Sequence, residues 1–86
     1  MARTTYLPET AILKELLLDL RVRAGLRQVD LAKAIRRPQS FISEYERGQR
    51  RLDLIELREV CVACSTTLRK LVGEYERRLE TLTGKT

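Results

Sequence analysis

The chain has 86 residues and a mass of 10.0 kDa, enough for one small domain with a single core. Its net charge is +5, it contains no histidine, and its aromatic residues are three Tyr and one Phe. The commonest general base and metal ligand is therefore missing, which weighs against an enzyme, and the core must be mainly aliphatic.

The first predicted helix begins at Pro8, a residue that suits the first helical position. Glu9 follows at the positive end of the helix dipole, and Gly25 is placed to end the helix. Apolar residues recur between them at steps of three and four, which predicts one buried helical face. They are Leu13, Leu16, Leu17, Leu20 and Ala24.

Two short helices are predicted next, from about residue 28 to 35 and from about residue 38 or 39 to 47. In the first, Leu31, Ala32 and Ile35 should face inward. In the second, Tyr45 and either Phe41 or Ile42 should do so, and Gly48 follows as a residue that readily ends a helix. The turn between them is short, so the pair has the form of a helix-turn-helix.

The fourth helix has the clearest start, because Asp53 and Glu56 have the spacing of a capping box. Leu57, Val60, Cys61 and Cys64 then share one face. Thr66 or Thr67 caps a fifth helix, from about residue 67 to 82, with Gly84 beyond it. Five helices with short connections predict a single all-α domain over residues 1–86.

Positive charge is concentrated in one third of the chain. Residues 21–51 hold nine Lys or Arg and three Asp or Glu, a net charge of +6, while the remainder is nearly neutral. Such a segment indicates a polyanionic partner, nucleic acid or an anionic membrane surface, or simply a solvated charged face. Because the cations are spread over several helices, an amphipathic membrane-surface helix is the weaker interpretation.

The sequence from residue 25 to 57 reads GLRQVDLAKAIRRPQSFISEYERGQRRLDLIEL. It resembles the Xre, or Cro/lambda-repressor-like, helix-turn-helix family, and the resemblance extends over residues 13–72. It implies a compact five-helix lambda-repressor-like domain, with the motif at about residues 28–47, that binds double-stranded DNA as a homodimer. The residues that fall on the family's motif are Gly25, Leu26, Gln28, Leu31, Ala32, Ile35, Ser40, Ile42, Ser43, Glu46, Arg47, Gly48 and Arg51.

The resemblance assigns roles to polar residues around the motif. The start of its second helix enters the major groove, where side chains read base edges. Cations on either side neutralise phosphates and fix the register. Base contacts are expected from Gln39, Ser40, Ser43 and Glu44, and phosphate contacts from Arg27, Gln28, Arg37, Arg47 and Arg51.

The resemblance also implies an ion pair between Arg21 and Glu46, which would tie the first helix to the recognition helix. Four positions depart from the family pattern, and one of them is Glu44, a negative charge where many relatives carry a basic or amide residue. Arg36 occupies a turn position usually held by glycine, so a positive φ there would be strained. Arg27 replaces the usual capping Ser or Thr, which leaves Asp30 half of a capping box, and Ser65 stands where glycine commonly closes the fourth helix.

The cysteines form a CxxC sequence, Cys61-Val-Ala-Cys64. Redox activity, or half of an intermolecular metal site, is one interpretation of this spacing. Packing in the core as small apolar residues is the favoured one, because both sulfurs lie on one helical face and no second pair completes a zinc site. No metal and no cofactor are expected.

The fifth helix carries a heptad-like seam that is longer than the packing of five helices requires. We expect it to form the dimer interface, with core packing of its first half as the alternative. Its residues are Leu68, Val72, Tyr75, Leu79 and Leu82.

The predicted function is that of a sequence-specific transcriptional regulator, a repressor that binds a two-fold-symmetric operator. The alternative is an antitoxin or a restriction–modification controller protein, which would bind a protein partner such as a toxin as well as its own operator. The longest apolar run, Val60–Cys64, has five residues against the ~20 of a membrane span, and no signal peptide is recognisable. We therefore expect a cytoplasmic protein without a membrane partner.

Overall fold

The computed structural model describes residues 8–83, which form five helices and, within that range, no strand. The all-α prediction is confirmed; the predicted role of Gly84 lies outside the described residues. None of the helices in residues 8–83 is long and apolar enough to cross a membrane. The helices are α1 (Pro8–Arg23), α2 (Gln28–Ile35), α3 (Gln39–Glu46), α4 (Leu54–Ala63) and α5 (Leu68–Thr83).

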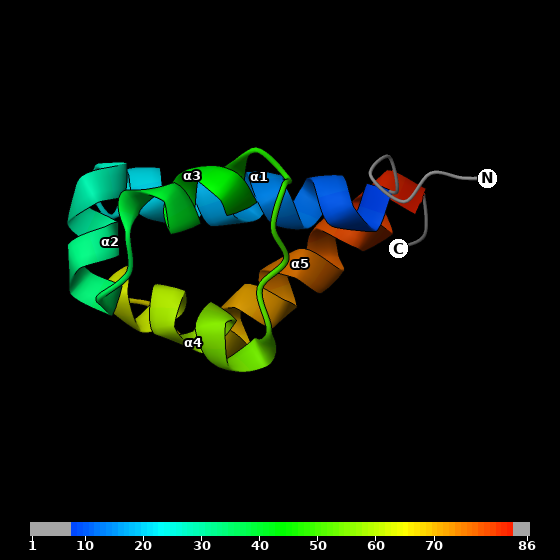
Figure 1. Ribbon diagram of the computed structural model, residues 1–86. Coiled ribbons are helices and arrows are strands. Elements are labelled where there is room, and N and C mark those ends of the chain that lie inside the picture. Colours follow the sequence, from blue (N-terminus) through cyan, green and yellow to red (C-terminus); the bar gives the residue numbers. More distant parts are fainter. Residues whose placement is uncertain (1–7, 84–86) are drawn as a thin grey trace.

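The helices enclose one core. In Figure 1, α1 and α3 lie along one side, α4 lies on the opposite side, and α2 closes one end. The long α5 packs against both α1 and α4 and runs towards the start of α1. All five helices contribute to the core, whose buried side chains are Leu16, Leu17, Leu31, Ala32, Phe41, Ile42, Tyr45, Val60, Cys61, Cys64 and Leu71.

The helix faces that were predicted to point inward are buried, and in α3 the buried face is wider than predicted. The sequence left open whether Phe41 or Ile42 faces inward, and the structure buries both. This short helix is covered on two sides, since α1 and α2 both pack against it. Consequently only a narrow strip of α3 remains available to solvent.

Helix starts follow the predicted capping residues. Asp53 Oδ1 accepts a hydrogen bond from the Glu56 N–H at 2.7 Å, and Glu56 Oε1 accepts one from the Asp53 N–H at 2.9 Å. Thr67 caps α5, because its Oγ1 accepts from the Lys70 N–H at 3.1 Å. These bonds satisfy backbone donors that a helix leaves unpaired at its start.

Two non-glycine residues end helices in the left-handed conformation. Arg36, in the turn between α2 and α3, has φ 60°, and Ser65, after α4, has φ 63°. A Cβ in this region crowds the following carbonyl oxygen, at a cost of about 1–2 kcal/mol. The strain expected at Arg36 is therefore present, at the turn that sets the angle between the two helices of the motif.

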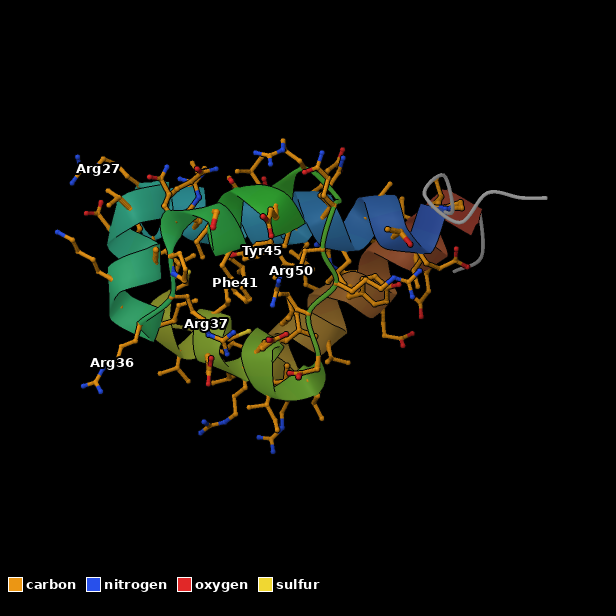
Figure 2. The ribbon with its side chains drawn as sticks, viewed as in Figure 1. Arg27, Arg36, Arg37, Phe41, Tyr45 and Arg50 are labelled. Carbon is orange, nitrogen blue, oxygen red and sulfur yellow. The ribbon has the colours of Figure 1, made fainter. Side chains whose placement is uncertain are left out.

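Arg36→Gly should raise the free energy of unfolding by about 0.5–1 kcal/mol, because glycine relieves the strain but gains more entropy in the unfolded chain. The Arg36 side chain points away from the helices in Figure 2, so its loss removes no packing. Arg36→Ala, which shortens the side chain but keeps the Cβ, is the matched control and should leave stability nearly unchanged. Urea denaturation measures both variants; equal stabilities would contradict strain at this turn.

Candidate nucleic-acid interface

The exposed strip of α3 carries the four predicted base-reading residues. Gln39 and Ser40, in the first turn, are exposed, and Ser43 and Glu44, one turn later, are half-buried. Phe41, Ile42 and Tyr45 turn the opposite way into the core. The structure therefore brings the four polar side chains together on one surface at the start of the second motif helix.

A chain of hydrogen bonds links this surface to the interior. Gln39 Nε2 donates to Gln28 Oε1 at 3.2 Å, and Gln28 Nε2 donates to Glu46 Oε1 at 2.8 Å. The amide of Gln28, which the resemblance assigned to a phosphate, thus lies between two α3 side chains. Gln28 fixes the orientation of Gln39, and its own orientation is fixed by the acceptor oxygen of Glu46.

Arg21 and Glu46 form the ion pair that the resemblance implies. Arg21 Nε donates to Glu46 Oε2 at 2.7 Å, and Nη2 donates to Oε1 at 3.1 Å. The two side chains are only 14% and 7% exposed. The remaining Arg21 nitrogen, Nη1, donates to the Leu26 carbonyl at 2.9 Å. The hydrogen bond with Glu46 raises the pKa of Arg21, so this guanidinium is always charged.

Arg37 has partners inside the protein. Its Nη1 donates to Glu56 at 3.2 Å, its Nη2 donates to Glu59 at 3.5 Å, and its guanidinium lies 4.6 Å from the centroid of the Phe41 ring. Figure 2 shows Arg37 and Arg50 turned towards Phe41, while Arg27 and Arg36 project outward. Arg37 therefore connects the motif turn to α4, and a contact with phosphate would compete with these interactions.

Arg50 is an interaction partner that the sequence did not indicate. Its guanidinium lies 4.5 Å from the Phe41 centroid, 3.9 Å from Glu44 Oε1 and 4.0 Å from Glu56 Oε2. The pairing with Glu44 holds one predicted base-reading carboxylate towards the loop after α3. Only the tertiary fold brings these residues together, so no local spacing pointed to the contact.

Three of the predicted phosphate-contacting residues, Arg27, Arg47 and Arg51, are exposed. Arg27 is 78% exposed and donates two side-chain hydrogen bonds to Asp30. These bonds, and one from the Arg27 backbone N–H, lower the pKa of Asp30 to about 2. Because an arginine side chain has no hydrogen-bond acceptor, Arg27 cannot accept a bond from the Asp30 N–H. Only the Asp30 half of the capping box forms, as expected. Arg47 donates to the Gln49 side chain at 3.0 Å.

The two cysteines belong to the core. Cys61 is 0% exposed and Cys64 is 7% exposed. Burial raises the pKa of both thiols, that of Cys64 to about 11, so both are neutral at pH 7. Among residues 8–83 no group of three His, Cys, Asp or Glu side chains could hold a metal ion. This arrangement favours packing over redox or metal chemistry.

The predicted dimer seam on α5 is only partly exposed in the single chain, and its role as a dimer interface stays a prediction. Leu68 and Tyr75 pack against the monomer core, and the Tyr75 hydroxyl donates to the Glu9 carbonyl at 3.2 Å. Leu79 is half-buried, whereas Val72 and Leu82 are 47% and 54% exposed. The heptad spacing arises because α5 packs against α1, which buries the side of α5 that carries Leu68 and Tyr75.

Comparisons with known proteins agree with this geometry. A helix-turn-helix domain family matches residues 13–72. An XRE-family-like protein from Pseudomonas syringae pv. tomato strain DC3000 is 40% identical, with a TM-score of 0.74, over 81% of this chain and 84% of that one. The clp gene regulator ClgR from Corynebacterium glutamicum is 26% identical, with a TM-score of 0.70, over 79% of this chain and 87% of that one.

The restriction-modification controller protein C.Esp1396I is similar in fold. Its TM-score is 0.78 over 87% of this chain and 97% of that one, at 17% identity. No curated protein matches the sequence. The chain belongs to the helix-turn-helix domain family, and within it to the XRE-like DNA-binding regulators, which are not enzymes.

Glu46→Ala should lower the free energy of unfolding by about 3 kcal/mol, because it leaves the poorly exposed Arg21 without its counter-charge. Replacing both partners, as Arg21→Met with Glu46→Leu, should cost less than the sum of the single changes. Glu59→Ala removes a partner of Arg37 that is 41% exposed and should cost less than about 1 kcal/mol. Additive effects of Arg21→Met and Glu46→Leu in urea denaturation would contradict a coupled pair.

Proposed function

We propose that the protein is a cytoplasmic, sequence-specific DNA-binding repressor that acts as a homodimer on a two-fold-symmetric operator. The observation that carries the proposal is the hydrogen-bond chain from Arg21 through Glu46 and Gln28 to Gln39. It holds a base-reading amide in a defined orientation on the exposed strip of α3. An oriented glutamine can grip adenine through two hydrogen bonds, and this is the property that reading of sequence requires.

Each of the four polar residues of α3 has a different role in the recognition of bases. Gln39 and Ser40 lie at the start of the helix, which enters the major groove most deeply in this motif. Glu44 can accept a hydrogen bond from the amino group of cytosine and repels phosphate, so it discriminates against other bases. Ser43, whose Oγ donates to the Ser40 carbonyl at 3.3 Å, has a supporting role.

Phosphate contacts come from the exposed arginines at either side of this strip. Arg27 lies at the start of α2, and Arg47 and Arg51 lie beyond the end of α3. Their attraction is independent of sequence, fixes the position of α3 in the groove and weakens with salt. Gln28 and Arg37 contribute mainly by orienting Gln39 and by connecting α3 to α4.

Repression is the simplest consequence of such binding. A protein that occupies an operator blocks access of other proteins to the same DNA. A domain of this size contacts few base pairs, so a second copy on a symmetric half-site, about 34 Å away, supplies the missing affinity.

The dimer needs an apolar surface, and α4 carries three exposed large apolar side chains against two on α5. Leu54, Ile55 and Val62 are 63%, 71% and 56% exposed, and Ile55 and Val62 lie on one face because they are seven residues apart. Exposed apolar clusters of this kind mark protein contacts. We therefore place the dimer contact on α4 instead of on the whole α5 seam.

The second candidate is a controller protein of a restriction–modification system, or an antitoxin, which also binds its own operator. It is favoured by the match in length and fold to C.Esp1396I. A toxin or other protein partner would cover the same apolar surface of α4. A neighbouring reading frame for a restriction enzyme or a toxin would support this candidate.

Selection of bound sequences from random duplex DNA should give a two-fold-symmetric consensus. Gln39→Ala should lower affinity for that sequence by about 1–3 kcal/mol and relax the preference at one base pair of each half-site. Glu44→Lys should strengthen binding to all duplexes and change the preference at a different base pair. Identical consensus sequences for both variants and the unmodified protein would show that α3 is not the reading helix.

Ile55→Asp should yield a folded monomer with weak operator binding, because a charge cannot be buried in an apolar contact between two copies. Leu82→Asp is the matched control on α5 and should remain dimeric. Neither side chain belongs to the monomer core, so circular dichroism should be unchanged in both. Sedimentation that shows a monomer only for Leu82→Asp would return the interface to α5.

A further inference from the structure

A pocket of about 340 Å³ lies between the first half of α1, the loop after α3 and the middle of α5. This volume is within the range of small-molecule sites in proteins. It is not on the exposed strip of α3, and of its lining residues only Arg51 has a role in the proposed binding of DNA. Its lining divides into an apolar part and a charged part.

The apolar part consists of aliphatic and aromatic side chains from four segments of the chain. Leu13 and Leu17 come from α1, Leu52 from the loop before α4, and the rings of Tyr45 and Tyr75 from α3 and α5. Leu17 and Tyr45 are 3% exposed and belong to the core, so this part of the pocket is fixed by the fold. An apolar group placed here would be removed from water.

The charged part has an excess of cations. Lys14, Arg50 and Arg51 line the pocket, against the one carboxylate of Glu9. Among residues 8–83, Lys14 and Arg51 make no side-chain hydrogen bond or ion pair, and Arg50 makes two long ion pairs, of 3.9 and 4.0 Å, besides its contact with the Phe41 ring. Several nitrogen donors beside an apolar surface are therefore available to an anion.

We propose that this pocket binds a small organic anion with an apolar body, such as an aromatic or short aliphatic carboxylate. The carboxylate bonds to Lys14 and Arg51, and the apolar body lies against Leu13, Leu52 and Tyr75. A DNA phosphate or an inorganic phosphate would satisfy the cations but would leave the apolar side chains without a partner. The combination of both parts favours the amphipathic anion.

The pocket is connected to the recognition helix. Tyr45 is part of α3, and Arg50 pairs with Glu44 on the same helix. A bound carboxylate also neutralises Arg51, which we assign to a DNA phosphate. We therefore expect the ligand to lower DNA affinity; this consequence rests on the proposed function, whereas ligand binding itself does not.

The experiment is a titration of the full chain, without DNA, followed by nuclear magnetic resonance of the backbone amides. Phenylacetate, indoleacetate and hexanoate are the probes, phenylacetamide is the neutral counterpart of the first, and inorganic phosphate tests charge alone. At least one probe carboxylate should shift the amides of Lys14, Gly48 and Leu52 saturably, at concentrations where phenylacetamide and phosphate do not.

Lys14→Gln and Arg51→Gln should each weaken binding of that carboxylate about tenfold or more, because each removes a charge-assisted hydrogen bond. Lys70→Gln is the matched control: it removes the same charge from an exposed position of α5 that does not line the pocket. Its affinity for the carboxylate should equal that of the unmodified protein.

Several results would overturn the proposal. One is the absence of saturable shifts with all three carboxylates, and another is equal binding of phenylacetamide. If phosphate shifts the same amides saturably and with the same dependence on Lys14, the pocket is a phosphate site. If residues 1–7 contact Leu13 in the free protein, the pocket is filled by the protein's own chain. Failure to bind any duplex DNA would instead refute the proposed function and leave the carboxylate result intact.

Discussion

The position of α3 depends on the ion pair between Arg21 and Glu46. Both partners are poorly exposed, so each would be costly to bury alone, and only one relative placement of α1 and α3 lets both hydrogen bonds form. Because Glu46 also accepts from Gln28, and Gln28 from Gln39, the same placement fixes the first polar side chain of the recognition helix. A structural ion pair and the orientation of the amide that we propose reads bases are thus one constraint.

On the side that carries Phe41, α3 is held in place by contacts with cations instead of by close packing of another helix. Phe41 lies between the guanidinium groups of Arg37 and Arg50, each within 4.6 Å of the ring centroid, and both arginines reach Glu56 at the start of α4. Contacts of a cation with an aromatic face are stronger where water is excluded. The loop after α3 is consequently coupled to α4 and to Glu44, and a ligand that engages Arg50, as we propose, would act on α3.

Local patterns predicted the elements of this fold and not the contacts between distant ones. The capping residue Asp53 and the periodic leucines of α1 act within a few residues, and the sequence alone located them. For the cap of α5 the sequence left Thr66 and Thr67 open, and the structure shows Thr67. The partners of Arg37 are 19 and 22 residues away, and no spacing rule links them. For the same reason periodicity shows that Tyr75 faces an apolar surface, but it does not show that this surface includes α1 of the same chain.

The ion pairs of the folded chain determine how much of its positive charge is available to DNA phosphates. Residues 21–51 have a net charge of +6, which already subtracts Asp30 and Glu46, the partners of Arg27 and Arg21. Arg37 pairs with Glu56 and Glu59, which lie outside this segment, so one cation fewer is available to phosphates than the net charge suggests. The sequence-independent part of DNA affinity falls with the number of available cations. In the proposed function, discrimination between DNA sequences then depends more on the side chains that α3 holds in place. The internal arginines stabilise the geometry that we propose reads bases, and Arg37 also lowers bulk attraction, so both effects act in the direction of specificity.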